Sequence, residues 1–432
     1  MKTPFFRALI LYIAVAAVIA SGQEALSLDE AVRLALLNNS SIAMARQEIE
    51  ASSGRVLLAG AIPQPELGFS WSEIPSDFNI AGYGERGIGV SQAVEFPGKR
   101  ALRQRAARWD LQIRKEALHR AEMRVTAAIK RAFDTVLLDR ELVANAGEAL
   151  NLLRRIHRIA ELRYESGSVP YLDILRIQME MARMENRILD LKRYQSRGLS
   201  DLNRLLFLPD SAVYGLNGTL SFQPFNQSLE ETMARLSSDR PSSRIAEAEE
   251  ARGRALASLA RKSWLPDLSA GLINQTLRER PPYNANNFYG TTVRNNWELN
   301  VGISVPVWFW SQQRGEIAVA RSAERIARIS RLEAGRNLAA SIRNAYENVK
   351  TAEAQALRFR QSLLKDCEDA LGTSQSLYQN GQMDILNLLD VTRACLETKS
   401  DYANTLHRYR IALTDLEIAG EESINPGERD ED

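Results

Sequence analysis

The chain has 432 residues, of which 45% are hydrophobic and 25% charged, and its 55 basic and 54 acidic side chains leave a formal net charge of +1. These proportions exclude a disordered, collagen-like or low-complexity chain, and the balanced charge provides no basic face for nucleic acid. Three histidines and two cysteines are too few for a Cys/His metal cage. We therefore expect no metal site and no cofactor.

The first 22 residues have the order of a cleaved secretory signal peptide. Lys2 and Arg7 flank a short basic region, an apolar run covers residues 8–20, and the small residues Ser21 and Gly22 follow. The apolar run is shorter than the roughly 20 residues that a membrane-spanning helix needs. We predict an exported protein that is either soluble outside the cytoplasm or inserted into a membrane through β-strands.

The mature chain contains two similar halves, offset by about 213 residues. The sequence Gly-Val-Ser at 89–91 returns as Gly-Ile-Ser at 302–304, and the turn Tyr-x-x-Gly at 164–167 returns at 378–381. Each half reads as a helix, two strand-like runs, a very long helix, a glycine turn and a returning helix. An internal two-fold repeat of a mainly helical fold is therefore predicted.

The expected elements follow the same order in both repeats. In the first repeat, residues 23–215, they are strands at about 65–73 and 86–95, a long helix at 99–165 and a return helix at 170–207. In the second repeat, residues 216–420, they are strands at about 266–277 and 297–307, a long helix at 311–379 and a return helix at 384–420. The acidic tail, residues 421–432, is predicted to be disordered.

The long helices alone do not decide the function. Apolar residues recur every seven positions along them, which is typical of coiled coils. A soluble periplasmic coiled-coil adaptor or scaffold would have the same pattern. Extraction separates the two hypotheses, because a membrane channel should need detergent and a soluble adaptor should not.

The strand-like runs favour a membrane protein. Leu299, Val301 and Ile303 alternate with small polar residues, so that one face is apolar and the other is rich in Gly, Ser and Asn. A soluble sandwich usually carries Lys, Glu or Thr on its solvent face, whereas small polar residues suit a wet lumen opposite lipid. Tryptophans lie in or beside these runs, as they do at membrane–water interfaces.

Four strands cannot close a barrel, and unpaired strand edges in lipid would be costly. We therefore expect several copies of the chain to share one barrel embedded in outer-membrane lipid. Three copies would supply twelve strands and leave a lumen. Loops at 74–85 and 279–296 would then close the outer end of the barrel.

With two repeats, each carrying a strand pair, a long helix and a Tyr-x-x-Gly turn followed by Asp or Asn, the chain resembles the TolC-like outer-membrane efflux family. The segment Phe-Pro-Gly-Lys-Arg at 96–100 is similar to the cation-efflux (CzcC-like) branch. The resemblance implies a homotrimer with a twelve-stranded β-barrel in the outer membrane and an α-helical barrel in the periplasm. It also implies a periplasmic adaptor (membrane fusion) protein and an inner-membrane pump, of the resistance-nodulation-division type in the cation branch.

The same resemblance implies a passive conduit for pumped substrates, heavy-metal cations in the cation branch, and no catalytic site. It places adaptor docking at the hairpin tips, on Gly167, Ser168, Val169, Gly381, Gln382 and Met383. The two glycines have a second explanation, since a left-handed residue commonly ends a helix. Met383 stands where the family can carry an arginine.

The resemblance further implies a periplasmic gate or constriction built from Asp173, Tyr378, Asn387 and Asp390. The alternative is that the two aspartates are solvated residues near helix N-termini, where the helix dipole favours them. Cys367 and Cys395 each lie fourteen residues from Gly381, so an antiparallel hairpin turning there places them at similar heights. An oxidising periplasm permits a disulfide between them, and two free thiols are the alternative.

Overall fold

The computed structural model describes residues 25–74, 84–210, 212, 214–237, 240–279, 292–305 and 312–422. The predicted signal peptide and residues 423–432 of the tail lie outside this part of the chain. The fold divides into two compact units. The first contains Met1–Arg46, Ala117–Ser242 and Gly335–Asp432, and the second contains Gln47–Glu116 and Ser243–Ala334.

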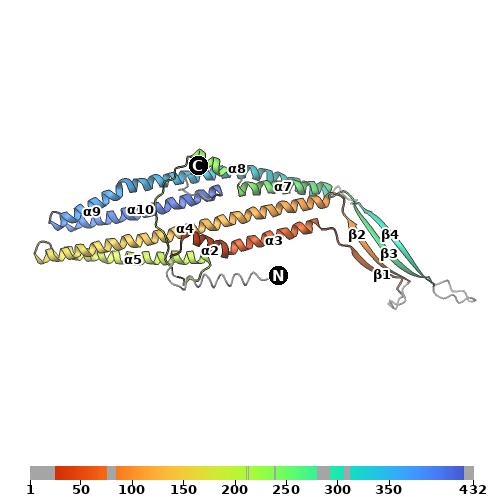
Figure 1. Ribbon diagram of the computed structural model, residues 1–432, viewed down its shortest axis with the longest axis horizontal. Helices are drawn as coiled ribbons and strands as arrows, with labels where there is room; N and C mark the ends of the chain where they lie inside the picture. Colours follow the sequence, from red (N-terminus) through yellow and green to blue (C-terminus); the bar gives the residue numbers. More distant parts are fainter. Residues whose placement is uncertain are drawn as a thin grey trace, which may run out of the picture. The chain divides into compact units, whose positions relative to one another are not determined.

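The two repeats have the same order of elements, as predicted (Figure 1). The first repeat consists of α2 (Leu28–Asn38), α3 (Ser40–Gly60), β1 (Glu66–Ser72), β2 (Glu85–Val94), α4 (Lys99–Glu165) and α5 (Tyr171–Leu206). The second consists of α6 (Leu229–Ser237), α7 (Pro241–Lys262), β3 (Asp267–Glu279), β4 (Thr292–Ser304), α8 (Gln312–Arg358), the π-helix η2 (Phe359–Leu363), α9 (Leu364–Gln379) and α10 (Ile385–Gly420). Among the described residues, no helix combines the length and apolar character needed to cross a membrane.

Three details differ from the sequence-based expectation. Each repeat opens with two helices instead of one, because Asn39 accepts a hydrogen bond from the Ser41 amide between α2 and α3, and Pro241 begins a new helix after α6. The expected helix at 311–379 changes to π geometry at Phe359–Leu363. The expected loop at 279–296 was wrong at its C-terminal end, because β4 already begins at Thr292.

The four strands form one antiparallel sheet in the order β1-β2-β3-β4. Pairing of β2 with β3 joins the two repeats, so that neither repeat has a complete sheet of its own. The apolar side chains of one face are exposed, with Trp297 at 71% and Val301 at 72% accessibility. All four helical connections leave from one end of the sheet, since β1 and β3 begin there and β2 and β4 end there.

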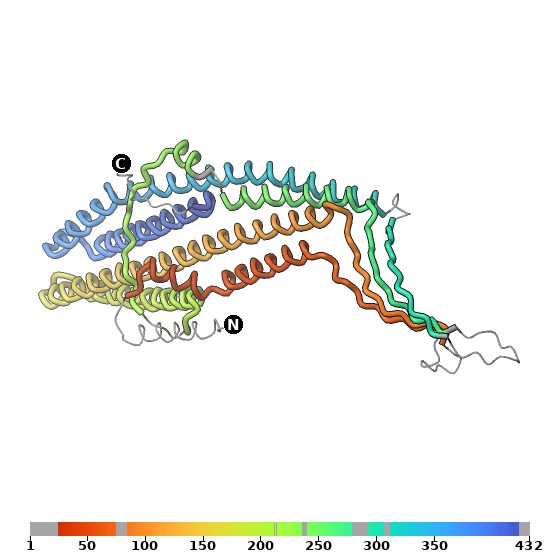
Figure 2. Tube along the Cα trace, turned by 45° about the vertical axis from the view of Figure 1, so that its right-hand side comes forward, coloured from red at the N-terminus to blue at the C-terminus, as the bar shows by residue number. Residues whose placement is uncertain are grey.

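In the first unit, α4 and α5 form one helical hairpin, and α9 and α10 form another (Figure 2). The linker between the repeats packs against α4, α8 and α10. The Arg140 guanidinium donates to the Leu216 carbonyl oxygen, the Tyr409 hydroxyl donates to the Gln223 carbonyl oxygen, and the Phe225 amide donates to the buried Glu353 carboxylate. These bonds satisfy polar groups of a segment that lies outside the named helices and strands and contains an isolated β-bridge from Leu216 to Leu26.

Candidate gate and docking site at the hairpin tips

The two hairpins turn through the same backbone motif. Gly167 and Gly381 have φ values of 69° and 76°, which lie in the left-handed region where a Cβ atom is disfavoured. The amide after each glycine bonds to a carbonyl five residues back, from Ser168 to Arg163 at 2.8 Å and from Gln382 to Leu377 at 2.8 Å. This pair of turns is the Schellman arrangement that ends a helix.

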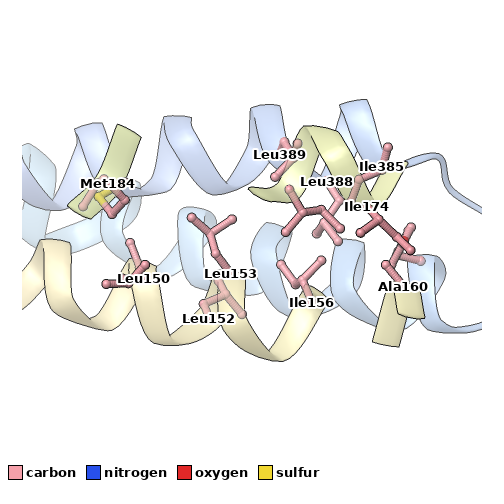
Figure 3. Close-up of a cluster of buried hydrophobic side chains, with 14 of the residues drawn as sticks. Leu150, Leu152, Leu153, Ile156, Ala160, Ile174, Met184, Ile385, Leu388 and Leu389 are labelled. Atoms are coloured by element: carbon pink, nitrogen blue, oxygen red, sulfur yellow. The ribbon is translucent and has the colours of Figure 1, made fainter. Parts of the chain in front are cut away.

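Hydrophobic side chains from both hairpins meet just beside the turns. Figure 3 shows side chains of α4, α5 and α10 pointing toward one another. The cluster contains Leu150, Leu153, Ile156 and Ala160 of α4, Ile174, Ile177 and Met184 of α5, Tyr378 of α9, and Ile385, Leu388 and Leu389 of α10. The tips are therefore held together by a shared core within one chain.

Tyr378 and Asp173 lie at the border of this core. Tyr378 is only 1% exposed, and its hydroxyl finds no hydrogen-bond partner among the described residues. Arg163 of α4 crosses to it: the guanidinium carbon lies 5.0 Å from the ring centroid, and Nη1 donates to the Tyr378 carbonyl oxygen at 2.5 Å. Arg163 of the first repeat thus supplies a cation next to Tyr378 of the second repeat. Position 383, where the family can carry an arginine, is a methionine in this chain.

Asp173 is 8% exposed and follows the start of α5. Burial raises the pKa of its carboxyl, and the nearby carboxylate of Asp384 raises it further, while the Arg176 and Arg163 guanidinium groups act in the opposite direction. Arg176 lies 3.8 Å from the carboxylate. Asp173 is thus a largely buried carboxylate that lies in the first turn of α5.

Asn387 and Asp390 are exposed on α10. The Asn387 amide donates to the side chain of Asp384, which caps this helix. Asp390 accepts a hydrogen bond from Arg393 Nη1 at 3.2 Å. The four predicted gate residues thus separate into a buried pair between the hairpins and an exposed pair on one helix.

Arg393 also joins the two hairpins. Its Nε and Nη2 atoms donate to the two carboxylate oxygens of Glu180 on α5, at 3.0 and 2.6 Å. Glu180 is buried, and the hydrogen bonds from Arg393 lower the pKa of its carboxyl, against the effect of burial. A two-point arginine–carboxylate bond is among the strongest polar contacts in proteins. Arg163, Glu180 and Arg393 were absent from the predicted site.

The predicted docking residues form the solvent-facing part of both turns. Gly167, Ser168, Gly381 and Gln382 are exposed, whereas Val169 and Met383 are half-buried. Met383 packs against the shared core. Next to the first turn, the exposed rings of Tyr164 and Tyr171 lie 5.6 Å apart between their centroids.

Cys367 of α9 and Cys395 of α10 form a disulfide in the structure, with their Cα atoms 5.2 Å apart. The bond lies in the second hairpin, shortly after the π-helix. In the described part of the chain, no group of three or more His, Cys, Asp or Glu side chains could hold a metal ion.

Comparison with known proteins agrees with this arrangement. The family model "Outer membrane efflux protein" matches residues 31–206 and 234–419. The cobalt-zinc-cadmium resistance protein CzcC of Cupriavidus metallidurans is 22% identical over 397 residues, covering 91% of this chain and 90% of CzcC.

Solved structures share the fold. The Campylobacter jejuni CmeC outer membrane channel matches with a TM-score of 0.73 at 17% identity, over 93% of this chain and 87% of that one. The Vibrio cholerae outer membrane protein VceC matches with a TM-score of 0.74 at 16% identity, over 91% of this chain and 96% of that one.

A repeated strand pair, long helical hairpins and this family match together define an outer-membrane transport protein. The chain belongs to the outer membrane efflux protein family. It is an efflux channel component of a tripartite system, located in the outer membrane with its helical domain in the periplasm. The family consists of channel and transport proteins and not of enzymes.

Proposed function

We propose that three copies of this chain form the channel, with their four-stranded sheets closed into one twelve-stranded barrel. The support is the sheet itself: β1 and β4 are its edge strands, and its apolar face is exposed. Edge strands in lipid leave backbone groups unpaired at several kcal/mol each, and pairing between copies removes that cost. Small polar residues on the other face then line the lumen.

The hairpin tips are the proposed docking surface for the periplasmic adaptor, which connects the channel to an inner-membrane pump of the resistance-nodulation-division type. Gly167, Ser168, Gly381 and Gln382 present backbone and small polar groups to solvent. Val169 and Met383 support the turns from beneath, because both are half-buried. The energy for transport comes from the pump, and the channel conducts passively.

The proposed cargo includes divalent heavy-metal cations. The support is the relative CzcC, whose name records resistance to cobalt, zinc and cadmium. The exposed carboxylate of Asp390, repeated three times around a trimer axis, would attract such cations. A strain lacking the protein should lose resistance to at least one of these three metals and regain it from a plasmid copy; unchanged resistance to all three would reject this cargo.

The proposed gate consists of the contacts that join the two hairpins of each chain, and opening requires that they separate. The observation that carries this proposal is the two-point bond from Arg393 of α10 to buried Glu180 of α5. Arg163 and Tyr378 make a second contact between the hairpins. Asp173 belongs to this contact through its buried carboxyl, and Asn387 and Asp390 line the exposed side of α10.

Single-channel conductance in planar bilayers tests the gate. Arg393→Gln should raise the open probability, because it removes the bond between the hairpins. Arg183→Gln is the matched control, since Arg183 also contacts Glu180, at 3.4 Å, but from the same helix. Equal conductance of wild type and Arg393→Gln, or an equal effect of both variants, would contradict the gate.

A further inference from the structure

The two helical hairpins differ in how their own helices are joined. In the second hairpin, Cys367 of α9 and Cys395 of α10 form a disulfide. At the offset between the two glycine turns, the corresponding residues of the first hairpin are Leu153 and Met181, which lie in or against the shared core. Because the chain has two cysteines, the first hairpin has no covalent link of this kind.

The start of α9 is positioned by α10, which lies beside it (Figure 1). The π-helix η2 interrupts the α-helical hydrogen-bond pattern between α8 and α9. Phe359 of η2 packs against Tyr402 of α10, with 6.2 Å between the ring centroids. Cys367 follows near the beginning of α9. A ring contact and a covalent bond therefore fix this end of α9 on α10.

The disulfide extends from the core toward the surface. Cys395 is only 3% exposed, and its neighbour Leu396 belongs to the shared core of the hairpin tips. Cys367 is half-buried. A small reductant therefore reaches the bond from the Cys367 side.

The two contacts of the proposed gate come from different helices of the second hairpin. The carbonyl oxygen of Tyr378, in the last turn of α9, accepts a hydrogen bond from Arg163. Arg393 of α10 donates to Glu180 and lies less than one helical turn before Cys395. The disulfide thus joins the two helices that carry these contacts, which limits how far one helix can move without the other.

We infer that the disulfide between Cys367 and Cys395 couples the two gate contacts, so that the second hairpin moves as one body and both contacts break together. This inference rests on the proposed gate and adds a redox control to it. In the oxidising periplasm the bond is formed. A dithiol reductant cleaves the S–S bond by supplying two electrons and two protons; the reductant becomes a cyclic disulfide, and the protein is left with two thiols. Each contact can then break without the other.

Single-channel recording of the wild type with and without dithiothreitol on the periplasmic side tests the coupling. The oxidised channel should pass between closed and fully open in one step. The reduced channel should show intermediate conductance levels and an open probability about threefold higher, because two neighbouring contacts no longer act together. Intact mass after alkylation should show two labels in the reduced protein and none in the oxidised one.

The matched control is Cys367→Ser combined with Cys395→Ser. It should show the intermediate levels without reductant and should not respond to dithiothreitol. If this variant does not assemble, the reductant measurement on the assembled wild-type channel decides by itself. Native mass spectrometry should show that reduction leaves the particle intact; dissociation would mean that the bond serves assembly and not gating, and would overturn the inference.

Two further outcomes would overturn the coupling. One is unchanged single-step gating of a wild-type channel in which both thiols are shown to be free, and the other is a response of the double serine variant to dithiothreitol. Arg393→Gln distinguishes this failure from failure of the gate itself. Altered gating in Arg393→Gln together with no effect of reduction rejects the coupling alone, whereas unchanged gating in Arg393→Gln rejects the gate and the coupling with it.

Discussion

Asp134 is a buried carboxylate on α4 whose ionisation costs stability. It is 3% exposed, and Arg410 Nη2 lies 2.9 Å from its Oδ1. Burial raises the pKa of this carboxyl from 3.8 to about 6, although Arg410 and Lys130 favour the charged form. Since the folded pKa is the higher one, the folded state holds the proton more tightly, and stability falls as the pH rises from about 4 to about 6.

Asp134→Asn should therefore remove this pH dependence. The free energy of unfolding of the wild type, relative to the variant, should fall by about 2–3 kcal/mol between pH 4 and pH 7. Denaturant unfolding at a series of pH values in one detergent measures the difference. Parallel curves for the two proteins would show that Asp134 ionises in the folded state as easily as in water.

Single residues of the proposed gate were only partly predictable. Tyr378 and Asp173 were suggested by the resemblance to the efflux family, and both side chains are buried in the structure, Tyr378 as a member of the shared core. No local motif marks Glu180 and Arg393, because these two residues bind each other across a sequence separation of 213 residues. This separation is close to the offset between the two repeats, so the two residues occupy corresponding positions on α5 and α10. A search for oppositely charged residues at that offset could have found this pair.

The turns between the helices are the elements most sensitive to a side chain. Gly381→Ala should lower stability by about 1–2 kcal/mol, because an L-residue is disfavoured at its φ of 76°. Gly372→Ala is the control within the same hairpin: Gly372 lies inside α9 with no atom within 4 Å of an added Cβ, so this change should stabilise by about 0.5–1 kcal/mol. Thermal unfolding of both variants should therefore shift in opposite directions. Two shifts of the same sign would contradict the strain assigned to the turn.

Elements with strong periodicity were predicted well, and elements without it were not. The two-residue alternation gave all four strands, and the absence of proline gave the long helices. The start of β4 was missed because Arg294, Asn295 and Asn296 read as a loop, whereas they are the part of the strand that lies beyond the apolar rows. The sequence patterns that we used do not distinguish the π-helix at Phe359–Leu363 from an α-helix, because the helical pattern of apolar residues continues on both sides of it.

At the scale of the whole molecule, the sheet is the feature that requires other copies of the chain. One copy supplies four strands with an exposed apolar face, and its edge strands are β1 and β4. The repeat explains why a single chain carries two hairpins of strands and two of helices. The sequence could predict this incomplete sheet, but the proposed number of three copies rests on barrel geometry and on the family, and not on any residue pattern.

The most direct test of the account is the number of chains in the particle extracted from outer membranes. Native mass spectrometry of the detergent-solubilised protein should show three copies, and removing the detergent should cause aggregation. The matched measurement is extraction of the same membranes with high salt alone, which should release none of the protein. A single copy that stays in solution without detergent would contradict the shared barrel and, with it, the channel.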